Sequence, residues 1–396
     1  MKPVAPIFSL VVLIGLWAMP LVVNAGTVWD LDLPVPGGDP LWADVAALWN
    51  AHWDEENIHT LIQTLHRLES KYPDKPDIQL WLARAYYLKS RYQGRDRVHN
   101  LKQSEIHAAR ALALDRSSVV AMKLLITSVS SYADLSYIAK TYGKLFEKRP
   151  RLPVGPALPP LDIPGFRSAL ESWNGREDIE KGLKAVAAFR AVADQHPENS
   201  LAQIWVARGN YYLGYYYLSM DQYDRGLSYF EEGNRYGMKA LALSFHSVPA
   251  NYWRQLNLAR SIQNANIFVK AAHLKAIMGN LVFTANENMT YFYCGPLIST
   301  ATIIEKGGWV AEKGVGMAGY NLDMVTTGLE LAVMAYPTYF YIHFAKAEVL
   351  YHLGKKDACR KLLDQILEMD PHENPYHAAE NLCTQRLVRL YIAEFF

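Results

Sequence analysis

Apolar residues recur at the three- and four-residue spacing of amphipathic helices along almost the whole chain. Leu61, Leu65 and Leu68 form one such stripe, and the segment 362–367 carries another. The alternating pattern of half-buried strands is scarce. Helix-breaking dipeptides interrupt the pattern at ordinary helix lengths, namely Tyr72-Pro73, His196-Pro197, Tyr336-Pro337 and Asp370-Pro371. The pattern therefore predicts an all-α protein.

Three of these prolines share a sequence context. An alanine follows each of them ten residues later, and the pairs are Pro73 with Ala83, Pro197 with Ala207, and Pro337 with Ala347. A small residue lets the two helices of a pair approach closely, while proline ends one helix and orients the next. Pro337 and Pro371 are 34 residues apart, which is the tetratricopeptide period. The context predicts a tetratricopeptide-like α-solenoid of antiparallel helix pairs.

The repeat also indicates an internal duplication, offset by about 124 residues. Trp81 and Trp205 each lie eight residues after their proline, and Arg84 matches Arg208. Prolines crowd the segment 150–165, where no helix can continue, so an extended connector is predicted there, with a proline-rich peptide ligand as the alternative. The predicted organisation is a signal peptide at 1–25, a helical-repeat unit at 26–149, the connector at 150–165, and a second helical-repeat domain at 166–396.

The first 25 residues have the features of a secretory signal. Lys2 supplies a positive charge, residues 7–17 are apolar, and Val23-Asn24-Ala25 places small residues around a cleavage site. An uncleaved N-terminal anchor is the alternative, although the apolar stretch is short for a membrane span. No cysteine follows that would make a lipoprotein signal, and no later segment is long and apolar enough to cross a bilayer. We expect an exported protein without a stable membrane span.

Charge and cysteine content narrow the function further. Lys and Arg total 40 against 39 Asp and Glu, so the basic patch typical of nucleic-acid binding is absent from the composition. The three cysteines, Cys294, Cys359 and Cys383, form no C-x-x-C pair, which disfavours a zinc ribbon or a thioredoxin-like redox site. An oxidising compartment would permit one disulfide among them. The favoured interpretation is three small, buried packing residues.

Several weak motifs follow one another in a recognisable order in the second half of the chain. They are His196-Pro-Glu-Asn199, the segment 232–241, Pro249-Ala-Asn-Tyr-Trp253, Tyr291-Phe-Tyr-Cys-Gly-Pro296, the segment 328–337, Ala347-Glu348 and the segment 380–385. This order resembles the T component associated with TRAP transporters, the TatT family of periplasmic helical-repeat proteins, over roughly residues 170–392. The resemblance implies a periplasmic location, a homo-oligomer, association with a TRAP-type periplasmic solute-binding protein, and a small apolar or organic-acid ligand.

Motifs of catalytic chemistry give little support to an enzyme. Gly314, Gly316 and Gly319 fit G-x-G-x-x-G, but helical patterns flank them, so we expect an interhelical loop and no nucleotide. His59 and His66 would lie about 10 Å apart along one helix, as would His52 and His59, which is too far to share a metal ion. Signatures of hydrolases, metalloproteases and P-loop proteins are missing from the sequence. We predict no enzyme activity, no metal and no cofactor, although this rests on absent motifs.

Aromatic residues supply the candidate binding site. The chain has 25 tyrosines and 10 tryptophans, most of which we expect to pack between helices. Four of them fall in the motifs of the resemblance and beside predicted helix breaks. The predicted ligand-binding residues are these four with one polar neighbour: Tyr252, Trp253, Asn257, Tyr291 and Tyr293. Arg254 and Asn251 are further candidates for polar anchoring. An apolar wall with a few polar tips suits a small ligand.

The tyrosine-rich run at 211–217 is too continuous to occupy one face of a helix. At 100° per residue, seven successive positions surround the helix axis. The helix is therefore expected to be buried all round or to contact a partner on one side, and the second option favours an oligomer.

The sequence thus supports a periplasmic helical-repeat binding accessory of a TRAP-type solute uptake system. The alternative is an exported tetratricopeptide-like scaffold that organises envelope proteins and binds no small molecule. A deep apolar cleft between the Tyr252 and Tyr291 segments would favour the first, and a fully packed core there would count against it.

Overall fold

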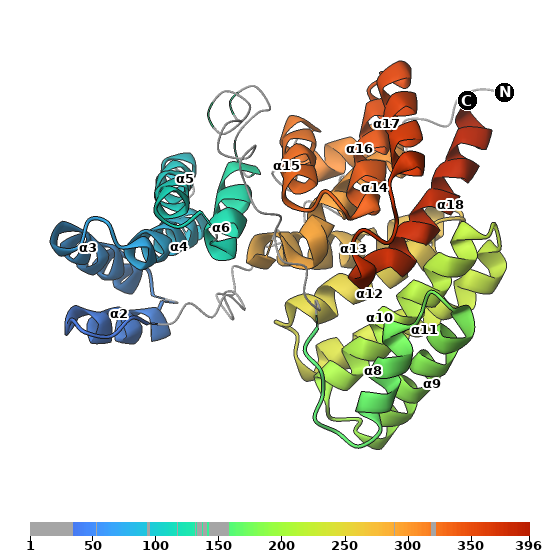
Figure 1. Cartoon of the computed structure of the whole chain (residues 1–396), viewed down its shortest axis with the longest axis horizontal. Helices are drawn as coiled ribbons and strands as arrows, with labels where there is room; N and C mark the ends of the chain where they lie inside the picture. The colour runs from blue at the N-terminus through green and yellow to red at the C-terminus, as the bar shows by residue number, and fades with distance from the viewer. Residues whose placement is uncertain are drawn as a thin grey trace. The chain divides into compact units, whose positions relative to one another are not determined.

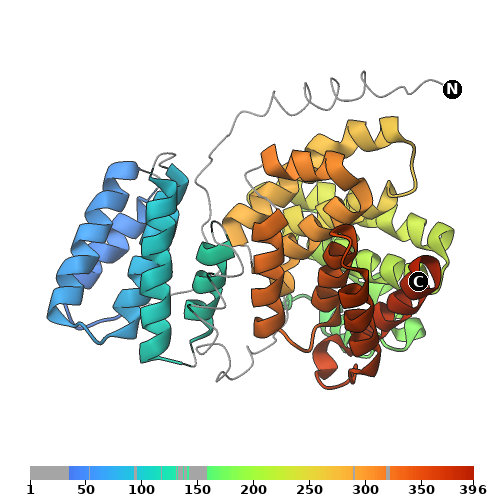
Figure 2. The same ribbon diagram turned by 90° about the horizontal axis from the view of Figure 1, so that it is seen from above.

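The computed structural model describes residues 35–52, 54–92, 96–116, 118–130, 132, 137, 141, 158–288, 290–317 and 322–396. Every regular element within these ranges is helical (Figures 1 and 2). Helices that follow one another in sequence pack together in pairs. The predicted all-α fold of tetratricopeptide-like helix pairs is confirmed. The predicted signal peptide at 1–25 and the first half of the predicted connector, residues 150–157, lie outside the described residues.

The described residues divide into two compact units. The N-terminal unit contains residues 35–141 and 322–336, and the C-terminal unit contains 158–317 and 337–396. The sequence placed all of 166–396 in one domain, whereas helix α15 (Leu322–Ala335) belongs to the N-terminal unit and packs against α6 (Val119–Ser130). The buried face of α15, which includes Val325 and Leu329, packs on a segment that is distant in sequence. No local sequence pattern identifies that segment.

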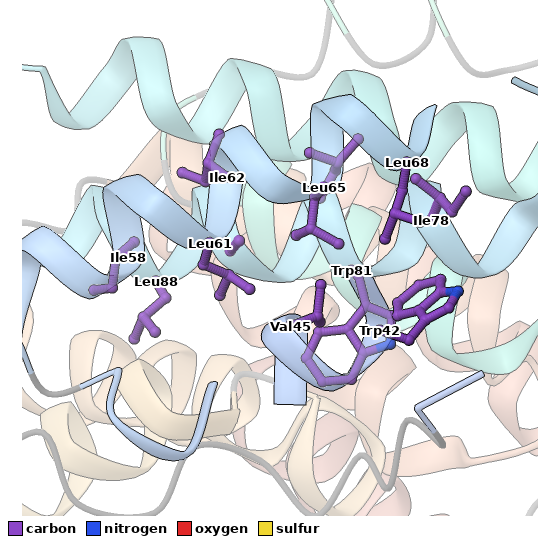
Figure 3. Packing of buried hydrophobic residues seen from close by; sticks show 12 residues of the cluster. Trp42, Val45, Ile58, Leu61, Ile62, Leu65, Leu68, Ile78, Trp81 and Leu88 are labelled. Carbon is purple, nitrogen blue, oxygen red and sulfur yellow. The ribbon is translucent and has the colours of Figure 1, made fainter. Parts of the chain in front are cut away.

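In the N-terminal unit, α2 (Leu41–Asn50), α3 (Glu55–Lys71), α4 (Pro76–Tyr92) and α5 (Arg97–Leu114) precede α6, and each packs on the next. Figure 3 shows the core that α2, α3 and α4 share. The stripe of Leu61, Leu65 and Leu68 predicted from helical spacing is fully buried there. It lies with Trp42 and Val45 of α2 and with Ile78, Trp81 and Leu88 of α4.

The C-terminal unit is built around one helix. Its elements in chain order are α8 (Phe166–Asn174), α9 (Ile179–Gln195), α10 (Ser200–Ser219), α11 (Tyr223–Leu243), α12 (Val248–Ser261), α13 (Ile267–Asn288), α14 (Tyr291–Met317), α16 (Phe340–His352), α17 (Lys356–Glu368), the short 3₁₀ helix η1 (Pro375–His377) and α18 (Ala378–Phe395). Helix α10 packs against α9, α11, α12 and α18. The tyrosine-rich run 211–217 therefore belongs to a helix enclosed within its own unit, which was one of the two predicted options. It gives no support to a partner contact.

The predicted helix ends are confirmed at all four proline dipeptides, because α3, α9, α15 and α17 end one or two residues before them. The glycine-rich segment differs from the prediction. Helix α14 continues to Met317, so Gly314 and Gly316 are helical and do not form an interhelical loop. Glycine lowers helix stability by about 1 kcal/mol relative to alanine, a cost that the surrounding helix tolerates here. Gly319 lies outside the described residues.

The duplication is visible as a repeated arrangement in the two units. Helices α3 and α9 are both 17 residues long. Asp54 and Asp178 begin them, and each side chain accepts a hydrogen bond from the backbone N–H two residues on. The arginine of each copy lies against two tryptophan rings, Arg84 beside Trp49 and Trp81, and Arg208 beside Trp173 and Trp205. Trp49 and Trp173 are a further equivalent pair that the sequence comparison missed.

The close helix packing that the repeat implies can be tested at Ala207. Its side chain is fully buried, and its carbonyl oxygen accepts a hydrogen bond from Asn257 Nδ2 at 3.0 Å, which holds α10 against α12. Ala207→Leu should lower the free energy of unfolding by about 1–3 kcal/mol through overpacking. Ala187→Leu, at an exposed position of α9, should change it by less than about 0.5 kcal/mol. Chemical denaturation of both variants checks this, and equal stabilities would contradict the assignment of Ala207 to a helix–helix contact.

Candidate functional site

The C-terminal unit encloses a small cavity with aromatic walls and two charged residues. Its volume is about 30 Å³, enough for about one or two water molecules. The lining residues are Trp173, Arg208, Tyr211, Tyr212, Tyr215, Trp253, Phe292, Tyr339, Tyr341 and Glu380. They come from five helices, α8, α10, α12, α14 and α18, and from the start of α16. A site built from so many elements exists only in the folded unit.

Helix α10 forms the largest part of the wall. Arg208, Tyr211, Tyr212 and Tyr215 are spaced three, four and seven residues apart, so they project from one face of this helix. The Tyr215 hydroxyl is hydrogen bonded to Thr384 Oγ1 of α18 at 3.0 Å, and burial raises the pKa of the Tyr215 hydroxyl well above its usual value. The wall therefore presents neutral phenols together with one permanent positive charge.

A buried ion pair closes one side of the cavity. Arg176 Nη2 lies 2.6 Å from Glu380 Oε2, and Arg176 Nε lies 3.1 Å from Glu380 Oε1, so the guanidinium binds the carboxylate through both oxygens. Burial acts to raise the pKa of Glu380, but the charge and hydrogen bonds of Arg176 outweigh it and hold the pKa below its usual value. Glu380 is therefore ionised at neutral pH.

Arg208 is the second buried cation of the site, and it has a different environment. Only 2% of it is exposed. Its guanidinium carbon lies 5.2 to 5.6 Å from the centres of four aromatic rings, those of Trp173, Trp205, Trp253 and Phe292. Such cation–π contacts are attractive, most of all where water is excluded. One of its nitrogens, Nη1, is buried and has no hydrogen-bond partner among the described residues.

The five residues predicted to bind a ligand are all buried in this region. Trp253 lines the cavity, and its Nε1 donates a hydrogen bond to the Tyr291 hydroxyl at 3.2 Å. The Tyr252 ring lies edge-on to both Trp253 and Tyr291. Tyr293 stacks on Tyr339, with ring centres 4.2 Å apart. Of the five, only Trp253 is among the cavity-lining residues, while three of the others surround it in an aromatic cluster.

Asn257 bonds to backbone carbonyl oxygens of α10 and of its own helix, and it is not among the cavity-lining residues. Its Nδ2 donates to the carbonyl oxygens of Ala207 and Trp253, at 3.0 and 2.8 Å. Its side chain also packs on Gly233, where an added Cβ would lie 2.2 Å from Asn257 Oδ1. Asn257 was predicted as a polar anchor, but it is not among the cavity-lining residues, whose charged members are Arg208 and Glu380.

Sequence reasoning missed most of the wall. The match of Arg208 to Arg84 in the repeat indicated that Arg208 is important for packing. It gave no reason to expect a cavity beside Arg208. Trp173 could have been found through its repeat partner Trp49, 124 positions earlier. Glu380 lies about 200 residues from Arg176, and no spacing rule connects them.

The backbone next to the cavity is strained. Phe292, Tyr293 and Cys294 have φ angles of 45°, 57° and 59°, in the left-handed region that residues other than glycine rarely adopt. The left-handed conformation costs roughly 1–2 kcal/mol for each such residue. Gly295 follows, and an added Cβ there would lie 2.2 Å from the Tyr252 hydroxyl oxygen. Phe292, which lines the cavity, is thus carried by a backbone segment held in place by the packing around it.

The strained backbone predicts that glycine is more stable than alanine at Cys294, the reverse of the order in a regular helix. At a φ of 59°, Cys294→Gly should be more stable than Cys294→Ala by about 1 kcal/mol, because only glycine adopts this conformation freely. Cys359 is equally buried but lies in the regular helix α17, so there the alanine variant should be the more stable, again by about 1 kcal/mol. Thermal and chemical denaturation of the four variants measures both differences. The same sign at the two positions would refute the strained conformation.

All three cysteines, Cys294, Cys359 and Cys383, are buried and none forms a disulfide. This agrees with their interpretation as packing residues.

A polar network in the N-terminal unit is the second cluster of titratable groups. Glu69 accepts hydrogen bonds from His66 Nδ1 and from Gln79 Nε2, both at 2.9 Å. The Tyr86 hydroxyl lies 2.9 Å from His66 Nε2, and His107 Nδ1 donates to Gln79 Oε1 at 2.8 Å. No group of His, Cys, Asp or Glu among the described residues has the geometry to hold a metal ion. The network joins α3, α4 and α5.

His107 makes this network sensitive to pH. Burial lowers the pKa of His107 from 6.5 to about 4. The charge of Glu69 opposes this decrease in pKa, whereas the charges of His66 and Arg110 add to it. The unfolded chain takes up this proton near pH 6.5 and the folded chain does not, so stability should fall between pH 6.5 and 4, by up to about 3 kcal/mol. His107→Gln should remove this part of the loss, whereas His59→Gln, at an exposed position of α3, should keep it. Urea denaturation across this pH range checks the expectation, and parallel profiles for the wild type and His107→Gln would contradict it.

Comparisons with known proteins add little to this description. No family model and no curated protein matches the chain. A solved structure that it is similar to is the crystal structure of yeast Tom70, at 12% sequence identity, over 89% of this chain and 96% of that chain, with a TM-score of 0.19. So low a TM-score supports no argument about this chain. Its description as a tetratricopeptide-like helical-repeat protein rests on its own helices.

No helix among the described residues combines the length and the apolar character that crossing a membrane requires.

Proposed function

We propose that this chain is a binding protein whose C-terminal unit holds a small ligand at the aromatic cavity, as an accessory of a TRAP-type solute uptake system. The observation that carries the ligand-binding part is the cavity itself, in which Arg208 lies among aromatic rings with one guanidinium nitrogen unpaired. A mostly apolar wall with a few polar groups is the usual character of small-molecule sites.

The size of the cavity limits the ligand. Sites for drug-sized molecules usually have volumes of roughly 300–1,000 Å³, so the 30 Å³ found here admits only a very small molecule or one group of a larger one. A larger ligand requires a wall to move. Phe292 is the wall residue best suited to this, because its φ of 45° is strained and a change to a negative φ would release the strain.

The TRAP-type role draws its support from the ordered motifs that resemble the TatT family. In this proposal the protein is periplasmic and homo-oligomeric, and it associates with a TRAP-type periplasmic solute-binding protein. Two of the motif segments lie at the site, since Trp253 and Phe292 line the cavity. The motif glycines Gly233 and Gly237 pack directly on Asn257 and Arg254 of α12, which carries Trp253. The resemblance thus includes residues that shape the cavity.

A scaffold without a small ligand is the second candidate. Phe268 at the start of α13 is 79% exposed, and its neighbour Val269 is also exposed. Exposed apolar side chains of this size favour contact with another protein when they form part of a patch. The two candidates differ in whether the cavity is occupied in the cell.

Native mass spectrometry of the protein purified from the cells that produce it tests the proposal. We expect a small-molecule adduct that is released on denaturation, together with a co-purified solute-binding protein. A preparation that holds other envelope proteins and no small molecule would favour the scaffold. Repeated preparations with neither an adduct nor a solute-binding protein would overturn the proposed function.

A further inference from the structure

The buried charges around the cavity do not balance. Arg176 and Glu380 form a complete pair, because Glu380 accepts from Arg176 through both oxygens. The remaining donors of Arg176 bind the carbonyl oxygens of Trp173 and Tyr376, at 3.1 and 2.9 Å. Each of the three nitrogens of Arg176 therefore already has a partner, and both oxygens of Glu380 already accept from Arg176.

Arg260, which donates to the hydroxyl of the lining residue Tyr341 at 2.6 Å, is offset by the nearby carboxylate of Glu348. Arg208 is left as one excess positive charge.

Apart from Glu380, the groups around Arg208 are neutral. Arg208 forms a hydrogen bond with the hydroxyl of Tyr376. The hydroxyls of the lining residues Tyr212 and Tyr215 bond to the Arg176 carbonyl oxygen and to Thr384. Burial raises the pKa of all three tyrosines, so none supplies a negative charge near neutral pH. His377 is also neutral there, because burial lowers its pKa.

Four aromatic rings compensate for only part of the lost hydration of this cation. Cation–π attraction is modest beside the cost of burying an unpaired ion, which proteins usually meet with a counter-ion. The unpaired Nη1 of Arg208 and the adjoining cavity of about 30 Å³ provide both a donor and a space for such an ion. One excess positive charge at the site matches a ligand with one negative charge, and it disfavours a ligand with more than one. The aromatic walls suit a group with an apolar side.

We propose that the cavity binds the carboxylate of a small monocarboxylic acid and that Arg208 is its anchor. This inference rests on the proposed ligand-binding function and names the chemical class of the ligand. The carboxylate accepts from Arg208 Nη1, and its carbon skeleton lies against Trp253 and Phe292. Charge-assisted hydrogen bonds to a buried guanidinium are among the strongest in proteins, so the charge of the ligand determines the affinity.

The duplicated half of the chain offers a matched control. Arg84 occupies the position equivalent to Arg208, and it too is buried against two tryptophan rings. His52 stands there in place of Arg176, since 52 and 176 differ by the same 124 positions. A substitution of Arg84 therefore removes a buried arginine–tryptophan contact in the other unit and leaves the cavity as it is.

The experiment compares acetate with acetamide, a neutral molecule of nearly the same shape. Dissociation constants for the full-length protein are measured by ligand-observed NMR at constant ionic strength, with pyruvate as a second acid. We expect acetate and pyruvate to bind and acetamide to bind at least about tenfold more weakly. Arg208→Gln should weaken acetate binding about tenfold or more, Arg208→Lys should weaken it less, and Arg84→Gln should leave it unchanged.

Glu380→Gln tests the charge with the opposite sign. Without the carboxylate the site holds two positive charges, so the folded variant should bind acetate more tightly than the wild type does. The comparison of acetate with acetamide uses the wild type, so it is informative even if neither Glu380→Gln nor Arg208→Gln folds. Equal binding of acetate and acetamide, absence of acetate and pyruvate binding, or unchanged acetate binding in Arg208→Gln would each overturn the inference. An uncharged ligand that co-purifies with both the wild type and Arg208→Gln would also overturn it, while leaving the proposed binding function intact.

Discussion

Helix α10 has no face turned to solvent, and the C-terminal unit is organised around this constraint. A helix buried on every side must find partners inside the protein for each of its polar groups. Gln203 donates to the carbonyl oxygen of Ala193, and Asn210 donates to that of Val206. Arg208 finds aromatic faces, a tyrosine hydroxyl and a small cavity. Arg208 Nη1 is the unsatisfied polar atom of the central helix that belongs to a charged side chain and lies beside the cavity.

The features that sequence predicted well are those that depend on neighbours along the chain. Proline disfavours a helical conformation at the residue before it, so the ends of α3, α9, α15 and α17 could be placed at the four proline dipeptides. The alanines ten residues later follow from the close approach of adjacent helices. The leucine stripe of α3 follows from helical geometry alone. In each case the physical cause lies within about one helix pair, and the sequence pattern contains it.

Other features depend on residues that are far apart or on conformations without a sequence signal. The packing of α15 on α6 joins segments about 200 residues apart, and the pair of Arg176 with Glu380 does the same. Bulky residues such as Phe292 seldom have positive φ, so nothing in the sequence indicates a left-handed segment there. Glycines in α14 suggested a loop because glycine usually weakens helices. Asn257 follows the Pro249–Trp253 motif in sequence, but its packing on Gly233 depends on helix α11, which this motif does not include.

The long separation between Arg176 and Glu380 has a consequence for the order in which the protein matures. Each unit is completed by a segment that is synthesised late, the N-terminal unit by α15 and the C-terminal unit by α18. A growing chain that stops before Ala378 contains both arginines of the cavity but not the carboxylate that neutralises one of them. Burying these two cations together without Glu380 would be costly. Docking of α18 therefore both neutralises Arg176 and completes the wall of the cavity, because Glu380 lines it.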